Sequence, residues 1–334
     1  MNVAFLTEIS FEGMWSTDFP NSRTEICWML ALNAFHYNIH DFLKVKRFDH
    51  VFVIIPKGKV FLSADGTKIV DGNNPISNLL ESNFVEILKN NNKKVYFIQE
   101  GGVDRHINDY TIEDQFNYYS QLTKFDIIFS HNEYDKSFYE GAFQNTIKVE
   151  VMPSLMMEHL ISHITWKPQN KIMLGGNFSH FYRGMQSYLM VRDIPDHSLW
   201  NMTSHSKRDG EEYIENLYHL PRLNWMNWME QLSTFKAGIH MMDLRAAGTF
   251  FLNCGYFGIV SIGNKLVDTS RLIYPDWCVD VYNLKQVFEK VNYLKENIND
   301  KKWLLSESEK TKENYKKHFS KEVYLSKLNK ILNE

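Results

Sequence analysis

At the end of an apolar run at 237–241, the sequence reads His240-Met241-Met242-Asp243-Leu244-Arg245-Ala246-Ala247-Gly248-Thr249, and this segment indicates the fold. A helical segment at 250–256 follows, and a second apolar run at 258–262 comes after it. Strand, helix and strand in this order are typical of a parallel sheet that is covered by helices. The loop sets an arginine and the free amide groups of a helix start at the carboxyl end of a strand, which is where such sheets bind anions.

The same alternation runs along the whole chain and predicts two α/β domains. In the first part we expect strands at 3–6, 51–55, 95–98, 127–129 and 149–151, with helices at 25–35 and 77–90. A polar stretch at 163–170 contains a proline and reads as a linker, after which strands recur at 171–174, 237–241 and 258–262. The region 284–332 has the spacing of two or three closing helices. The expected domains are therefore 1–165 and 166–334.

Length and composition agree with this organisation and exclude several classes of protein. The chain has 334 residues, 44% of them hydrophobic and 23% charged, and these values exclude a disordered tail, a fibre or a coiled-coil rod. The three cysteines, Cys27, Cys254 and Cys278, are too far apart for a zinc knuckle or a disulfide framework. With no signal-peptide pattern and no apolar run of about 20 residues, we expect a cytoplasmic protein without a membrane span.

Charge is distributed unevenly between the two halves. The net charge of -3 excludes a globally basic nucleic-acid binder. Residues 1–160 hold 14 Lys and Arg against 21 Asp and Glu, which gives -7, while residues 161–334 hold 23 against 19, which gives +4. The second half is the better anion binder, unless its surplus is only the solvated face of the terminal lysine-rich helices.

A second candidate loop follows the strand expected at 171–174. It reads Leu174-Gly175-Gly176-Asn177-Phe178-Ser179-His180-Phe181-Tyr182-Arg183-Gly184. Two glycines allow a tight turn and a close approach to a ligand, and Arg183 adds a charge-assisted bond to a phosphate at the next helix start. The alternative is a plain strand-to-helix turn with an exposed arginine. In the first loop, Asn253 lies four residues after Thr249 and on the same helix face, within reach of a ribose hydroxyl, or else it serves ordinary helix packing.

The segment 245–260 resembles the Glu-x-x-Gly-(x)4-Glu-(x)4-Gly-x-Pro pattern of GT-B glycosyltransferases. Gly248 and Gly258 match the glycines of the family, whereas Arg245 and Asn253 replace its two glutamates and Val260 its proline. The resemblance implies that Asn253 holds the donor ribose by a neutral hydrogen bond. It also implies that Arg245 is a diphosphate clamp, which argues against retaining transfer.

Three other stretches are similar to phage DNA glycosyltransferases that act on hydroxymethylated pyrimidines. These are the donor loop Gly175-Gly176-Asn177-Phe178, the strand at 94–100 that ends in a carboxylate, Glu100, and the terminal helices. The resemblance implies the GT-B architecture, with two Rossmann-like domains that face each other across a cleft. The N-terminal domain would bind the acceptor and the C-terminal domain the nucleotide sugar.

Candidate site residues follow from the motifs and the resemblance together. The donor set is Gly175, Gly176, Asn177, Phe178, Arg183, Ser204, His205, Leu220, Arg245, Ala247, Gly248, Thr249 and Asn253. The candidate base is Glu100, since it ends a strand before two glycines, and Asp18 and Glu25 are its rivals. Gly13, Glu25 and Arg105 are the acceptor candidates. No Asp-x-Asp triplet occurs, so neither a metal nor another cofactor is expected.

The expected activity is an inverting, metal-independent transfer of a hexosyl or pentosyl group from a nucleotide sugar such as a UDP-sugar. A hydroxymethylated pyrimidine in phage DNA is one acceptor, and the protein would then act in the cytoplasm of the host cell. The acidic first half speaks against DNA, because DNA affinity comes mostly from phosphate neutralisation. A glycan or small-molecule acceptor, a nucleotide-sugar epimerase and a sugar-nucleotide binding protein stay open as alternatives, and the sequence does not predict the oligomeric state.

Overall fold

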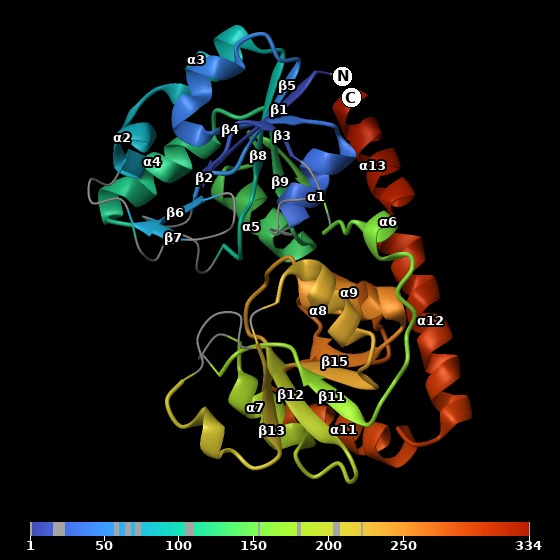
Figure 1. Cartoon of the computed structure of the whole chain (residues 1–334). Coiled ribbons are helices and arrows are strands. Elements are labelled where there is room, and N and C mark those ends of the chain that lie inside the picture. The colour runs from blue at the N-terminus through green and yellow to red at the C-terminus, as the bar shows by residue number, and fades with distance from the viewer. Residues whose placement is uncertain are drawn as a thin grey trace. The chain divides into compact units, whose positions relative to one another are not determined.

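The computed structural model describes residues 2–15, 24–56, 60–63, 68–70, 75–103, 110–152, 154–178, 182–202, 208–221 and 223–333. The chain forms two compact units (Figure 1). The first consists of Met1–Pro153 together with Arg245–Ala247, and the second of Ser154–Leu244 together with Gly248–Glu334. The units divide at Pro153 and Ser154, earlier in the chain than the expected boundary at 165, and the short segment 245–247 packs with the first unit although its neighbours in sequence belong to the second.

The first unit is built on a seven-stranded sheet in the order β10-β9-β8-β5-β1-β4-β3. All of its pairings are parallel except the antiparallel β3–β4 pair. The strands are β1 (Val3–Thr7), β3 (Gly13–Met14), β4 (Phe35–Asn38), β5 (His50–Val53), β8 (Lys94–Ile98), β9 (Ile127–Ser130) and β10 (Lys148–Val151). Apolar strand residues are buried on both faces, as a helix-covered parallel sheet requires.

Six helical segments of the first unit accompany this sheet. They are α1 (Thr24–Ala31), the 3-10 segment η1 (Ile39–Val45), α2 (Pro75–Glu81), α3 (Phe84–Asn91), α4 (Ile112–Leu122) and α5 (Glu133–Ala142). A small three-stranded sheet, which the sequence did not predict, contains β2 (Ile9–Ser10), β6 (Val60–Ser63) and β7 (Lys68–Val70).

The second unit contains a six-stranded, all-parallel sheet in the order β13-β12-β11-β14-β15-β16. Its strands are β11 (Lys171–Leu174), β12 (Ser198–Met202), β13 (Leu217–Leu220), β14 (Ala237–His240), β15 (Val260–Asn264) and β16 (Cys278–Val279). Counted in chain order, this arrangement is 3-2-1-4-5-6, the order of dinucleotide-binding Rossmann folds. The two Rossmann-like sheets expected from the sequence are therefore confirmed.

Helices surround the second sheet and end the chain. They are α6 (Glu158–Ile161), α7 (Gly184–Val191), the 3-10 segment η2 (Glu211–Tyr213), α8 (Trp225–Leu232), α9 (Thr249–Phe257), α10 (Asp268–Ile273), α11 (Leu284–Asn297), α12 (Lys301–Phe319) and α13 (Lys321–Asn333). The last three, orange to red in Figure 1, confirm the expected closing helices.

Two predicted helices of the first unit are shorter than expected. The helix predicted over 25–35 stops at Ala31, because Asn33 adopts a positive φ of 49° and Phe35 pairs with Ala4 on β1. The helix predicted over 77–90 is divided, and Ser82 Oγ donates to the Leu79 carbonyl oxygen at 2.6 Å where α2 ends. In both places side-chain or sheet hydrogen bonds compete successfully with the helix.

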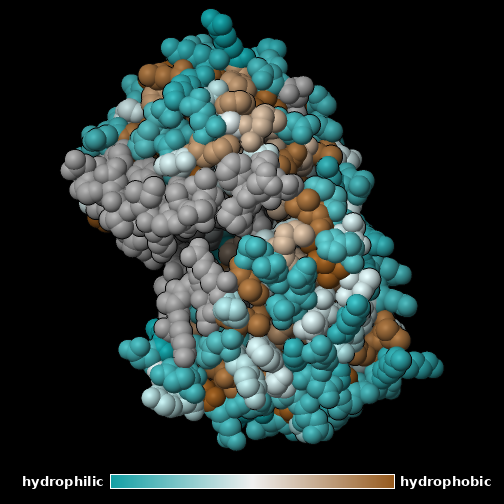
Figure 2. Space-filling model, in the orientation of Figure 1, coloured by the Kyte–Doolittle hydropathy of each residue, from teal (hydrophilic) through white to brown (hydrophobic). Residues whose placement is uncertain are grey.

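The described residues form a mostly hydrophilic surface on the face seen in Figure 2, and apolar residues appear there in small patches. Within the described ranges, no helix has both the length and the apolar character that crossing a membrane requires.

Candidate functional site

The switch point of the second sheet lies between β11 and β14, where the chain leaves for opposite sides of the sheet. Sheets of this kind bind ligands outside the carboxyl ends of the strands at this point. The glycine loop 175–178 follows β11, and the loop 241–248 follows β14, so the structure brings the two loops singled out in the sequence to one place. The Gly175 N–H donates to the Ile239 carbonyl oxygen at 2.9 Å and fixes the start of the first loop.

The glycine pair has a packing reason that the sequence did not show. A Cβ atom on Gly175 would lie 2.7 Å from Cβ of His240, and one on Gly176 would lie 2.8 Å from Nε2 of the same histidine. Asn201 Nδ2 donates to the Gly176 carbonyl oxygen at 2.8 Å. The two glycines therefore allow the loop to pass directly over His240. Beyond them, the Gly184 N–H donates to the Asn177 carbonyl oxygen at 3.0 Å, which closes the turn that leads into α7.

His240 is the buried floor beneath this loop. The residue is 4% exposed, and its ring lies among three aromatic rings, with centroid distances of 6.1 Å to Tyr182, 5.3 Å to Phe250 and 5.8 Å to Phe251. Neither ring nitrogen has a hydrogen-bond partner among the described residues. Burial lowers the pKa of His240 to about 3, so the ring is neutral at ordinary pH. The sequence analysis missed this residue.

Arg183 is held by two residues that the sequence analysis also missed. Its Nη2 lies 3.0 Å from Oδ2 of Asp243, and its guanidinium carbon lies 4.4 Å from the ring centroid of Tyr282. The Tyr282 hydroxyl donates to Oδ1 of Asp243 at 2.5 Å. This hydrogen bond is the main reason that the pKa of Tyr282 is raised. Arg183 therefore stands at the start of α7 as a positioned cation.

The start of α9 completes the second-unit site. Gly248 precedes it with a positive φ of 66°, and a Cβ atom there would overlap the Thr269 hydroxyl, which donates to the Gly248 carbonyl oxygen at 3.0 Å. Thr249 is exposed in the first turn, while Asn253 is 7% exposed on the buried side of the helix. Helix starts of this kind present free N–H groups to anions.

The remaining donor candidates are less informative. Phe178 is buried, with its ring 6.5 Å from that of Tyr188, and Leu220 is buried at the end of β13 beside Met202. Ser204 and His205 lie outside the described residues. The predicted donor-binding roles of these residues stay predictions.

Arg245 and Ala247 lie in the first unit, not in the second as the sequence analysis expected. The Arg245 guanidinium carbon lies 3.8 Å from the ring centroid of Tyr134, and its Nε lies 3.5 Å from Oδ1 of the fully buried Asp135. Asn132 Nδ2 donates to the Arg245 carbonyl oxygen at 3.4 Å. The guanidinium is thus held by an aromatic ring and a carboxylate of the first unit, and the diphosphate clamp predicted for Arg245 stays a prediction.

Glu100 lies at the carboxyl end of β8, as expected. The residue is half-buried, and the backbone around it is fixed because Gln99 Nε2 donates both to the Gly101 carbonyl oxygen and to Oδ2 of Asp135, each at 2.5 Å. A Cβ atom on Gly102 would lie 2.8 Å from the Arg245 carbonyl oxygen. The loop after β8 is therefore closely packed against the segment 245–247.

Most of the other first-unit candidates lie outside the described residues. Asp18 and Arg105 lie outside the described residues, as does the side chain of Glu25, whose backbone belongs to α1. Gly13 pairs with His36 across β3 and β4 and has a positive φ of 138°. Their predicted roles as rival base and acceptor-binding residues stay predictions. Among the residues described, no group of three or more His, Cys, Asp or Glu is placed to hold a metal.

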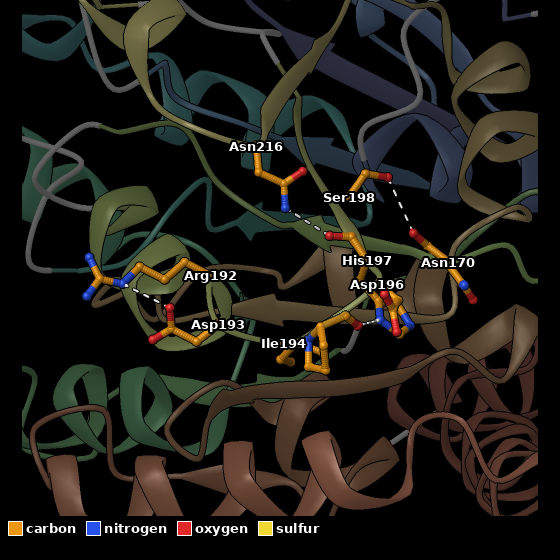
Figure 3. A pocket seen from close by; sticks show the side chains of 9 residues that line it. Asn170, Arg192, Asp193, Ile194, Asp196, His197, Ser198 and Asn216 are labelled. Atoms are coloured by element: carbon orange, nitrogen blue, oxygen red, sulfur yellow. Dashed lines mark hydrogen bonds and ion pairs between the residues drawn. The ribbon is translucent and has the colours of Figure 1, made fainter.

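A pocket of 560 Å³ lies elsewhere in the second unit (Figure 3). Its lining comes from the end of α7, the loop that follows it and the starts of β11, β12 and β13: Asn170, Arg192, Asp193, Ile194, Pro195, Asp196, His197, Ser198 and Asn216. Because it opens at the amino ends of the parallel strands, it is at the edge of the sheet opposite the two candidate loops. We therefore do not assign the candidate site to it.

No protein-family model and no curated protein matches this sequence. Solved structures match it over the whole chain. It is similar to an α-glucosyltransferase, AGT, in complex with UDP, at 12% identity and a TM-score of 0.68, with 100% of both chains covered. It is equally similar to an α-glucosyltransferase in complex with UDP and a 13-mer DNA containing an HMU base, at 13% identity and a TM-score of 0.66, again over 100% of both chains.

Two further structures extend the comparison. OtsA matches at 9% identity and a TM-score of 0.63, with 99% of each chain covered. S. aureus TarM matches at 11% identity and a TM-score of 0.61, with 93% of this chain and 59% of that chain covered. At these identities the likeness establishes the fold, and the GT-B architecture expected from the sequence is confirmed.

Proposed function

We propose that this protein is a GT-B glycosyltransferase that moves a sugar from a nucleoside-diphosphate sugar to an acceptor hydroxyl. One observation carries the proposal: Arg183 and the start of α9 lie at the switch point of a 3-2-1-4-5-6 sheet, where such sheets bind diphosphates. Solved structures with the same fold over their full length, two of them in complex with UDP, support it.

The second unit would bind the donor, for which we propose a UDP-sugar. Arg183 and the amides at the start of α9 would hold the diphosphate and stabilise its negative charge as it leaves. In this assignment Arg183 supplies positive charge that a metal supplies in other glycosyltransferases, and the sequence lacks the Asp-x-Asp triplet of that class. The proposed transfer therefore needs no metal or other cofactor.

Glu100 of the first unit is the proposed general base. Its carboxylate would take the proton of the acceptor hydroxyl while the hydroxyl oxygen forms a bond to the anomeric carbon. The bond between that carbon and the diphosphate oxygen breaks, and the electron pair leaves with the diphosphate. The rigid backbone around Glu100, held through Gln99 and Asp135, supports this role because a base must be fixed in position.

The stereochemical outcome is the point on which the sequence and the structural neighbours differ. Arg245 in place of the first family glutamate favours inversion. The neighbours with full coverage are named α-glucosyltransferases, and an α-product from an α-linked donor would retain the configuration. We keep inversion as the prediction, and the anomeric proton coupling of the product in an NMR spectrum decides between the two.

For the acceptor we propose a hydroxymethylated pyrimidine in DNA. The α-glucosyltransferase in complex with DNA containing an HMU base supports this choice. A glycan is the second candidate, because the acidic balance of residues 1–160, 14 positive against 21 negative side chains, disfavours a polyanion.

Replacing Glu100 by glutamine tests the proposed mechanism. We expect Glu100→Gln to lose at least about a hundredfold in turnover, which is the usual contribution of a general base, while UDP affinity stays unchanged. Glu150→Gln is the matched control, since Glu150 is another half-buried carboxylate of the first unit and lies on β10. Turnover by Glu100→Gln equal to that of this control would remove Glu100 from the mechanism.

A further inference from the structure

Three side chains from separate parts of the second unit form one cluster around Arg183. Arg183 precedes α7, Asp243 follows β14, and Tyr282 follows β16. Asp243 accepts a hydrogen bond from Arg183 Nη2 at 3.0 Å and one from the Tyr282 hydroxyl at 2.5 Å, and the guanidinium stacks on the tyrosine ring at 4.4 Å. We call these three residues the arginine clamp.

The clamp fixes the guanidinium in position and in orientation. The tyrosine ring restricts the guanidinium on one side, since the guanidinium carbon lies 4.4 Å from the ring centroid, and the carboxylate holds it at Nη2. The side chain of Arg183 is 14% exposed and that of Asp243 25%, so the pair is partly shielded from water without being closed off. Arg183 also has a left-handed backbone with φ 50° and ψ 41°, which is uncommon for a residue with a side chain.

Arg183 has more N–H donors than its contacts within the clamp use. A guanidinium has five N–H donors, and within the described parts of the chain the clamp engages one of them through Nη2. The guanidinium lies at the carboxyl edge of the sheet, which also carries the start of α9. A planar, oriented fork beside free amide groups suits a diphosphate better than a single phosphate or a neutral nucleoside.

We propose that Asp243 and Tyr282 are positioning residues that hold Arg183 for the diphosphate and make the second unit selective for nucleoside diphosphates over monophosphates and nucleosides. This inference rests on the proposed function, since it assumes a nucleoside-diphosphate sugar as donor. It adds two residues to the donor site and assigns them to recognition of the diphosphate.

The sign of the effect of Asp243→Asn distinguishes positioning from a bystander role. If Asp243 were only a nearby negative charge, its removal would reduce repulsion and tighten the binding of UDP. If it positions Arg183, its removal releases the guanidinium, and UDP binds more weakly although the site becomes more positive. A residue with a purely structural role would change the affinities for UDP and uridine together.

Isothermal titration calorimetry of the full chain with UDP, UMP and uridine tests the proposal. We expect Asp243→Asn to weaken UDP binding about tenfold and Tyr282→Phe a few-fold, with uridine affinity unchanged in both. Arg183→Gln should bring the affinity for UDP close to that for UMP. Arg192→Gln is the matched control, because Arg192 pairs with Asp193 at 3.6 Å at the other end of α7, and it should bind UDP like the wild type.

Failure of this inference can be told apart from failure of the proposed function. If wild-type protein binds UDP and Asp243→Asn binds it equally or more tightly, the positioning role is overturned while the glycosyltransferase proposal stands. If wild-type protein binds none of UDP, GDP and ADP, both are overturned. Tyr282→Phe keeps the ring and loses only the hydroxyl, so it provides a second variant if Asp243→Asn does not fold.

Discussion

His240 has the least favourable surroundings of the site residues. Both of its ring nitrogens are buried without partners among the described residues, and each such atom costs about 1 to 3 kcal/mol of stability. The ring lies between Gly175, Gly176 and three aromatic side chains, so it shapes the donor loop by its bulk. A phenylalanine would keep most of this shape and remove the polar atoms.

The low pKa of His240 predicts a dependence of stability on pH. Burial lowers its pKa from 6.5 to about 3, so between these pH values the ring is protonated in the unfolded chain and neutral in the folded chain. Above pH 6.5 the ring is neutral in both states and the free energy of unfolding has its full value. As the pH falls from 6.5 toward 3, the free energy of unfolding decreases by up to about 1.4 kcal/mol per pH unit. We expect urea unfolding between pH 7.5 and 4.5 to show a smaller loss of stability in His240→Phe than in the wild type.

The control for this experiment is an exposed histidine. His163 lies on the surface, and His163→Gln should lose stability with falling pH in parallel with the wild type. Parallel curves for His240→Phe as well would mean that the ring is protonated in the folded protein.

At the scale of elements, Gly248 determines how α9 begins. Its φ of 66° is unfavourable for any residue with a Cβ atom, and such an atom would overlap the Thr269 hydroxyl. We expect Gly248→Ala to reduce the free energy of unfolding by about 2 kcal/mol or more and to impair UDP binding. Chemical denaturation and calorimetry measure the two effects.

Gly141 in α5 is the matched glycine. A Cβ atom there meets nothing within 4 Å, so Gly141→Ala should stabilise the helix by up to about 1 kcal/mol. If the two alanine variants had the same stability, the strain assigned to the start of α9 would be wrong.

Elements with a strong local pattern could be predicted from the sequence, and those formed by distant pairing could not. Strands β1, β5, β8, β11 and β14 are short apolar runs, and all were expected. Strand β4 was not predicted, and its first residue, Phe35, was read as the end of a helix, because the strand depends on pairing with β1. The same applies to the site. Gly175 and Arg183 belong to one loop that can be recognised from the sequence. Asp243 and Tyr282 are 39 positions apart and meet only through the sheet topology.

Arg245 shows a further limit of pattern matching. Its position in the motif suggested the second domain, and the segment 245–247 folds with the first unit instead. Its partner Asp135 lies in the first turn of α5, more than a hundred residues away in sequence. A spacing rule within one loop could not show such a contact, because burial of Asp135 and its need for a cation determine it.

For the whole molecule, the uneven charge decides how the proposed DNA acceptor is tested. Lys46 and Arg47 are exposed basic residues of the otherwise acidic first part. If they and a third group neutralise three phosphates, affinity for hydroxymethylated DNA should fall about 40-fold between about 50 and about 200 mM salt. Fluorescence anisotropy should show a smaller salt slope for a Lys46→Gln, Arg47→Gln double variant and an unchanged slope for Lys301→Gln, Lys302→Gln. Affinity independent of salt would favour a neutral acceptor.

Mass spectrometry tests the proposed sugar transfer on acceptors incubated with the protein and either a UDP-sugar or a GDP-sugar, with and without a chelator. The acceptors are hydroxymethylated DNA, unmodified DNA and a mixture of glycans. We predict that hydroxymethylated DNA gains the mass of one sugar residue per modified base with a UDP-sugar, with or without the chelator, and that unmodified DNA gains nothing. Absence of a sugar adduct on every acceptor with every donor would contradict the assignment as a glycosyltransferase.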